Sequence, residues 1–281
     1  MKVGLYASMF GKSKDSFPDI ESFIDLAHDL HLDVIDLRSD VGFHDHTGDY
    51  LLRTKLNCLR KGLSIGYLAT GGHFTGSDEE LEKKIAGVRA DVDNALSLGA
   101  PMVRSFCGET PGDERARRRE VECFQQICDY AAGKGIAIGL QNHPCTGDGV
   151  LRLFDEVARD NFAFILDTGQ WVGSPAKNQG VGDPDVDIYH FMEQTAHLAV
   201  HVRAKFYKID SGAEAWLDYE RIYAILEGAG FNGTLSVVFE GQDVNACDDR
   251  QVLTLAAAQL RRLTGGPPVA GVDAPAGGGA R

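Results

Sequence analysis

Residues 136 to 169 read IAIGLQNHPCTGDGVLRLFDEVARDNFAFILDTG and contain the unit from which we predict the fold. Two near-continuous apolar runs, Ile136–Leu140 and Phe162–Leu166, flank a polar loop and a helical segment. Apolar runs of this kind are typical of strands that are covered on both faces, as in a parallel sheet. The stretch therefore predicts a strand, a helix and a second strand.

The same pattern recurs along the chain and predicts eight strands in all. The other six candidates are Val3–Ala7, Val34–Leu37, Ser64–Leu68, Met102–Phe106, Ala199–Lys205 and Thr234–Phe239. Eight strand–helix units in a chain of 281 residues fit a single α/β domain, a closed (β/α)8 TIM barrel of about 250 residues. An open doubly wound sheet is the alternative, but the turn after its first strand is usually a glycine-rich phosphate-binding loop, and Tyr6–Gly11 is not one.

Helix boundaries and the end of the domain are also marked. Ser77 and Glu80 have the spacing of a capping box. Glycines stand where four helices should end before the next strand, at Gly62, Gly99, Gly135 and Gly230. We predict a barrel over residues 1–264 and a disordered tail over residues 265–281, because the Gly, Pro and Ala of the tail bury too little apolar surface.

Composition excludes several classes of function. The chain has 28 Lys and Arg against 41 Asp and Glu, a formal charge of −13, which disfavours nucleic-acid binding. We see no apolar run long enough for a membrane span and no signal peptide. The six scattered cysteines are typical of reduced thiols, so we expect a cytoplasmic enzyme.

Polar side chains follow four consecutive predicted strands at the C-terminal face, where TIM barrels place their active sites. Because side chains alternate along a strand, His201, Arg203 and Lys205 share one face. Arg38 and Arg104, at the ends of the second and fourth strands, are candidate anion or hydroxyl binders. His73 follows Gly71 and Gly72, in a loop that could close over a ligand.

Structural interpretations of the same residues stay open. Asp167 before Thr168 and Gly169 is also a typical turn residue, and Glu240 before Gly241 could simply leave the last strand exposed. His201 lies deeper in its strand and is more typical of a hydrogen-bonded core histidine than of a ligand. Lys205 could extend to the rim of the barrel.

These strand ends resemble the xylose isomerase-like TIM-barrel superfamily of sugar isomerases and epimerases, which includes hydroxypyruvate isomerase and tagatose epimerase. The resemblance extends to about residue 263 and is most specific at Val200–Tyr207, Leu217–Tyr219 and Gly230–Gly233. It implies a barrel with its site at the strand ends, a small carbohydrate-like substrate and a homo-oligomer.

The resemblance also implies a divalent ion, Mn²⁺, Mg²⁺ or Zn²⁺, held by a Glu, an Asp, a His or Gln and a Glu on strands five to eight. Asp167 and Glu240 match that set, whereas Gln141 and Arg203 depart from it. A guanidinium has no lone pair to offer a metal and stays charged. Our hypothesis is that Arg203 binds both acids in place of an ion that is weakened or absent. The alternative retains a metal on Asp167 and Glu240 with Gln141 or His143.

The resemblance implies proton transfer next to a carbonyl, which needs a base and cations that stabilise an enediolate. The predicted catalytic residues are Glu240 as base, Arg203 and Lys205 as cations, and His143 or Lys205 as acid. The predicted substrate-binding residues are Gln141, Gln170, Asp167, His201, Arg38, Arg104 and His73. With a single carboxylate base, one-base isomerisation or elimination fits better than two-base epimerisation.

Two further functions stay open at this point. One is a lyase such as a C-glycoside deglycosidase subunit, which would form a hetero-oligomer with a partner chain. The other is a non-catalytic sugar-binding barrel. The sequence identifies neither the substrate nor the number of subunits.

Overall fold

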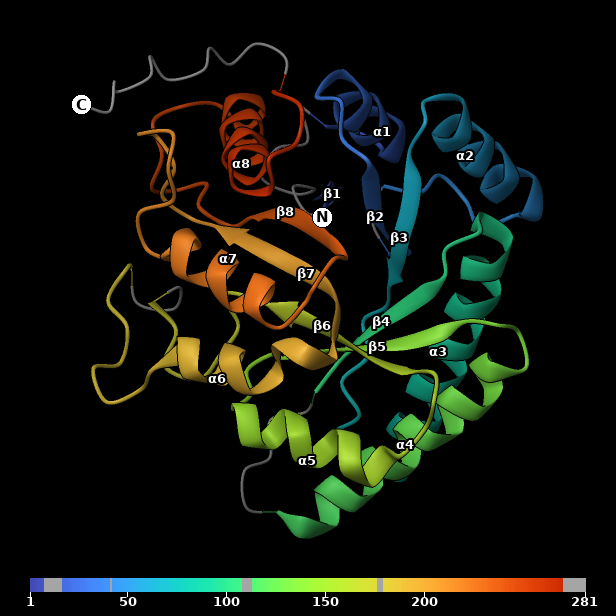
Figure 1. Cartoon of the computed structure of the whole chain (residues 1–281). Coiled ribbons are helices and arrows are strands. Elements are labelled where there is room, and N and C mark those ends of the chain that lie inside the picture. The colour runs from blue at the N-terminus through green and yellow to red at the C-terminus, as the bar shows by residue number, and fades with distance from the viewer. Residues whose placement is uncertain (8–16, 41, 108–112, 176–178, 270–281) are drawn as a thin grey trace.

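The structure, a computed structural model, describes residues 1–7, 17–40, 42–107, 113–175 and 179–269. Eight parallel strands pair in sequence order and close into a barrel, with helices around the outside (Figure 1). The strands are β1 (Lys2–Tyr6), β2 (Val34–Arg38), β3 (Ser64–Ala69), β4 (Met102–Phe106), β5 (Ala137–Gln141), β6 (Phe162–Asp167), β7 (Ala199–Phe206) and β8 (Thr234–Phe239). The predicted TIM barrel is confirmed, and each predicted strand agrees with the observed one to within one residue at either end.

The helices follow the strands in alternation. They are α1 (Ile20–Asp29), α2 (Gly48–Arg60), α3 (Asp78–Leu98), α4 (Glu114–Ala132), α5 (Gly147–Val157), α6 (Ile188–Thr195), α7 (Tyr219–Gly228) and α8 (Asp249–Thr264), with a 3-10 turn η2 (Ala196–Leu198) before β7. Ser77 and Glu80 form the predicted capping box at the start of α3. The four predicted helix-ending glycines all adopt positive φ angles, between 69° and 77°.

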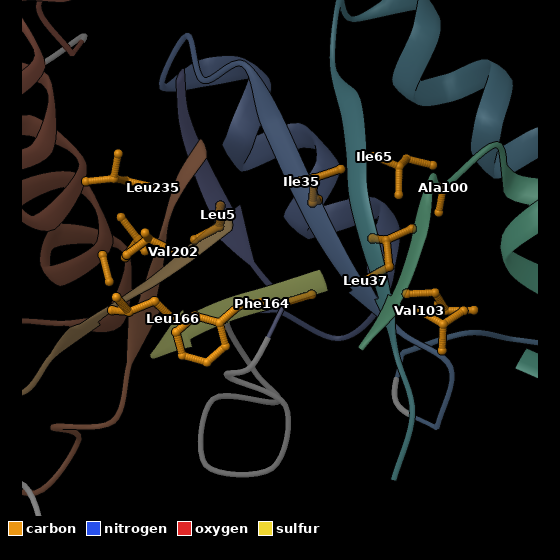
Figure 2. Close-up of a cluster of buried hydrophobic side chains, with 14 of the residues drawn as sticks. Leu5, Ile35, Leu37, Ile65, Ala100, Val103, Phe164, Leu166, Val202 and Leu235 are labelled. Atoms are coloured by element: carbon orange, nitrogen blue, oxygen red, sulfur yellow. The ribbon is translucent and has the colours of Figure 1, made fainter. Parts of the chain in front are cut away.

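The alternation of side chains along the strands separates an apolar layer from a polar interior. On β7, Val202, Ala204 and Phe206 are fully buried in the main hydrophobic cluster. Figure 2 shows part of this cluster, with Leu5 from β1 and Phe164 from β6 among its labelled side chains. Between these residues, His201 contacts Asp36 on β2 and Arg203 contacts Tyr67 on β3. Neither β2 nor β3 is a neighbour of β7, so the two side chains must cross the barrel interior.

A polar network fills the interior below the site. His201 Nε2 lies 2.9 Å from Asp36 Oδ2 and 3.1 Å from Ser236 Oγ. Gly66 packs against this network, because a Cβ at that position would come within 2.9 Å of the His201 ring. The barrel is therefore closed at this level, and the space for a ligand lies nearer the C-terminal ends of the strands.

The boundary predicted at residue 264 coincides with the end of α8. Gly265 ends α8 in the left-handed conformation, and Val269 is buried in the hydrophobic cluster. The rest of the predicted tail, residues 270–281, lies outside the described residues. No helix within the described ranges is long and apolar enough to cross a membrane.

Candidate active site

A cavity of about 220 Å³ opens where β1 to β5, β7 and β8 end. Its polar lining includes most of the residues that the sequence predicted, namely Arg38, Arg104, Gln141, His143, Arg203, Lys205 and Glu240. Tyr6, Phe106 and Phe239 supply apolar surface. The cavity therefore joins residues from the ends of seven strands and from the loops that follow them, as expected for a TIM-barrel site.

Asp167 lies just beneath the cavity and is fully buried. Its Oδ2 accepts hydrogen bonds from Gln141 Nε2 and Arg203 Nε, both at 2.9 Å, and lies 3.8 Å from Lys205 Nζ. Its Oδ1 accepts from the backbone N–H of Gly169 at 3.0 Å, which is the turn contact that the structural interpretation predicted. Both carboxylate oxygens of Asp167 are thus engaged within the protein.

Arg203 contacts one of the two acids. Besides Asp167, its guanidinium donates to the Tyr67 hydroxyl and lies 4.1 Å above the centre of the Tyr6 ring. Burial alone would lower the pKa of Arg203, but the surrounding tyrosines and Asp167 raise it well above its ordinary value. The prediction that Arg203 binds both acids is wrong for Glu240, because another cation occupies that position.

Lys205 is the cation that binds Glu240. Its Nζ donates to Glu240 Oε1, while its own side chain is only 1% exposed. The Glu240 side chain is 43% exposed and borders the cavity. Burial would raise the pKa of Glu240, but the charge and hydrogen bond of Lys205 outweigh that effect and lower it. Glu240 is therefore ionised at neutral pH and accessible from the cavity.

Arg104 has different surroundings on the opposite side. Its NH1 donates to Gln141 Oε1 at 2.8 Å, and its NH2 lies 3.5 Å from both the Tyr6 hydroxyl and the Thr70 carbonyl oxygen. The guanidinium stacks 3.9 Å from the centre of the Phe106 ring. At the rim, Arg38 pairs with Asp40 through two hydrogen bonds of 3.0 and 2.6 Å.

His143 packs in an aromatic group above Arg104. Its ring lies 4.8 Å from that of Phe106 and 5.5 Å from that of His73. Burial lowers the pKa of His143 and outweighs the charge of Asp167, which raises it, so the ring is neutral at pH 7. His73 stacks on Phe106 behind the cavity and is not part of its lining.

Two other predicted substrate-binding residues lie away from the cavity. His201 belongs to the polar network below it and is 3% exposed, so the core interpretation describes its position. Gln170 is buried after β6 and is absent from the lining. Neither side chain borders the cavity in this structure.

Sequence reasoning missed several residues that shape the site. Tyr6 and Phe106 lie at inward-facing positions near the ends of β1 and β4, and the alternation that was applied to β7 could also have identified them. Tyr67 could not be found in this way, because the pairing of β2 and β3 shifts register near it. Asp40 lies in the loop after β2, where alternation no longer applies.

The four positions at which the resemblance implies metal ligands do not fit a divalent ion. Asp167 is hydrogen-bonded through both oxygens, and the Gln141 oxygen accepts from Arg104. Arg203 and Lys205 bring two cations without lone pairs to within 4 Å of the Asp167 carboxylate, at 2.9 and 3.8 Å. Among the described residues, Asp19, Glu21 and His44 bring possible ligand atoms within 4.8 Å of one another, but they do not line the cavity.

Comparisons with known proteins agree with this architecture. The sequence pattern of the xylose isomerase-like TIM-barrel family matches residues 24–263. A comparison with curated protein sequences gives no significant match. A xylose isomerase domain protein from Planctomyces limnophilus superposes with a TM-score of 0.69 at 16% identity, over 94% of each chain.

Two further structures are similar at the level of the fold. D-psicose 3-epimerase from Clostridium cellulolyticum H10, solved with D-tagatose, gives a TM-score of 0.74 at 14% identity, over 94% of this chain and 98% of that one. An IolI protein with a bound zinc atom gives 0.71 at 14% identity, with the same coverage. Since the family pattern spans most of the chain and the barrel is complete, the chain belongs to the xylose isomerase-like TIM-barrel family.

Proposed function

We propose that this protein is an enzyme that acts on a sugar or keto-sugar by moving a proton next to a carbonyl group, in a site that works without a divalent ion. The observation that carries the proposal is the accessible carboxylate of Glu240, ionised and held beside Lys205 and Arg203 in one small cavity. A carboxylate can act as the base that forms an enediolate, and nearby cations can stabilise the negative charge on its oxygen.

Each group has a defined role in this proposal. Glu240 accepts the proton from the carbon next to the carbonyl. Lys205 and Arg203 stabilise the negative charge that develops on the carbonyl oxygen, and Lys205 can return a proton to it. Asp167 is a positioning residue, because it holds Arg203 at 2.9 Å and lies within 3.8 Å of Lys205.

The remaining polar groups suit the binding of hydroxyls. The neutral His143 ring borders the cavity, as does Gln141, although both ends of the Gln141 amide are already bonded to Arg104 and Asp167.

Apart from Glu240, Asp40 is the carboxylate in the cavity lining, and it is paired with Arg38 at the rim. One-base isomerisation therefore suits the site better than two-base epimerisation.

The test is hydrogen exchange into solvent. The wild-type chain is incubated in D₂O with a panel of ketoses, aldoses and keto acids, and NMR follows deuterium incorporation and product formation. We expect exchange with at least one compound and a decrease of roughly 10² to 10⁴-fold in Glu240→Gln. Products that have lost water or a glycosidic bond would indicate elimination rather than isomerisation.

Two results would contradict the proposal. One is unchanged exchange in Glu240→Gln. The other is a panel in which compounds raise the melting temperature but none exchanges, which would identify a sugar-binding barrel without catalysis. Gel filtration during purification checks whether the chain forms the predicted homo-oligomer or retains a second protein.

A further inference from the structure

Arg104 is a buried cation that forms no ion pair with a carboxylate among the described residues. An acid of the lining, Asp40, interacts with its charge from a distance and is itself paired with Arg38. The Arg104 side chain borders the cavity, and the residue is 4% exposed. The hydrogen-bond acceptors around it, on Gln141, Tyr6 and Thr70, are all neutral, and its Nε has no hydrogen-bond partner. A buried charge is costly unless an opposite charge compensates it. The surroundings of Arg104 therefore lack a negatively charged group.

The other cations of the cavity show what is missing. Arg203 binds Asp167, Lys205 binds Glu240 and Arg38 binds Asp40. The lining therefore holds one more cation than the acids that pair with it. This local excess of positive charge occurs in a chain whose formal charge is −13. Burial and the nearby charges of Arg203 and Arg38 lower the pKa of Arg104, and they outweigh the neighbouring tyrosines that raise it.

The space beside Arg104 is open to a ligand. The cavity of about 220 Å³ is smaller than the roughly 300–1,000 Å³ typical of sites for drug-sized molecules, so it suits a small molecule. Arg38 is 31% exposed on the same side of the cavity and could approach the same group. A planar guanidinium matches the geometry of carboxylate and phosphate oxygens.

We propose that the ligand of this cavity carries an oxyanion group, the carboxylate of a sugar acid or the phosphate of a sugar phosphate, which binds Arg104. The inference rests on the proposed function in that it names the substrate class of the same cavity. In the bound state the anion pairs with Arg104 on one side of the cavity, while Glu240 and Lys205 face the carbon skeleton of the ligand from the other side.

Matched pairs of ligands test the inference on the intact chain. Calorimetry and melting temperatures compare glucuronate with glucose, hydroxypyruvate with dihydroxyacetone, and fructose 6-phosphate with fructose. We expect the charged member of at least one pair to bind at least 10-fold more tightly than its neutral partner. The first two pairs report on a carboxylate and the third on a phosphate, so they distinguish the two sources.

Variants then locate the anion. Arg104→Met should abolish the preference for the charged ligand, whereas Arg250→Met, which removes an exposed arginine on α8, should leave it unchanged. Should Arg104→Met fail to fold, Arg104→Gln tests the same point, because a neutral amide can still donate to the Gln141 oxygen but carries no charge for the anion.

The outcomes separate this inference from the proposed function. Equal binding of charged and neutral partners, no binding of any anion at millimolar concentration, or a preference that survives Arg104→Met would each overturn the inference. Tight, Arg104-dependent binding of an acid that never exchanges hydrogen with solvent would support the inference and count against the proposed proton transfer.

Discussion

The two sides of the cavity both hold buried cations, but the cations contact acids on one side and neutral groups on the other. On the side of β6 to β8, Arg203 and Lys205 bind the acids Asp167 and Glu240. On the side of β4, Arg104 meets neutral oxygens and an aromatic ring. Burial acts on both arginines, yet the pKa of Arg203 is raised and that of Arg104 is lowered. Both arginines lie near Tyr67 and Tyr6, which raise their pKa values, but only Arg203 also has a carboxylate in direct contact. The positive charges of Arg203 and Arg38 act on Arg104 in the opposite direction.

This difference teaches that a buried charge must be interpreted together with its partner. On the paired side each cation contacts an acid, and removing either partner of a pair leaves the other charge uncompensated. On the other side, the charge of Arg104 is compensated only when a bound anion supplies a negative charge. The predictions below test this comparison, from the largest expected change in stability to the smallest.

Arg203→Met should have the largest effect, because it leaves the fully buried Asp167 without its closest cation. We expect the free energy of unfolding to fall by about 3–5 kcal/mol in urea denaturation. The double variant Asp167→Asn, Arg203→Met should recover part of that loss. Wild-type stability in Arg203→Met alone would show that the pair is not coupled as described.

Lys205→Met should have a smaller effect, because its partner Glu240 is partly exposed and screened by solvent. A loss of about 1–2 kcal/mol is expected at pH 7. NMR titration of the Glu240 carboxyl should show its pKa rising in the variant. Since the folded-state pKa is depressed, the pair stabilises fully above the unfolded pKa, and this stability is lost as the pH falls through the folded value. A pKa of Glu240 that does not change in Lys205→Met would rule out this coupling.

His143 should make stability depend on pH in a different range. Its pKa is lowered from the ordinary 6.5, so below that pH the unfolded chain binds a proton that the folded chain does not. Melting temperatures of the wild type should therefore fall from pH 7 to pH 5 more steeply than those of His143→Gln. His190→Gln, at an exposed position, is the control. Parallel curves for wild type and His143→Gln would contradict the assignment.

Arg104→Met should change stability least, within about 1 kcal/mol of wild type in ligand-free protein. The variant loses hydrogen bonds to neutral groups but also removes an uncompensated buried charge. The free energies of unfolding of Arg104→Met and Arg203→Met, measured under the same conditions, compare the two sides of the cavity most directly. Equal and large losses in both arginine variants would show that Arg104 has an internal partner after all.

Much of this arrangement could be predicted from local patterns. Apolar runs located all eight strands, and alternation along β7 placed Arg203 and Lys205 on the inner face. The pairing could not be predicted, because it depends on contacts between distant segments. His201 meets Asp36 across 165 residues, and only the closed barrel shows that Lys205 rather than Arg203 reaches Glu240.

The central claim is that cations of the chain occupy the position of a divalent ion, and metal analysis tests it most directly. Wild type and Asp167→Asn are purified without chelator, and their Mn, Mg and Zn contents are measured alongside Mn²⁺ binding by electron paramagnetic resonance. The account predicts the same metal content in both proteins, with any ion that binds near Asp19, Glu21 and His44 retained in the variant. One tightly bound ion per chain in wild type that is lost in Asp167→Asn would contradict it.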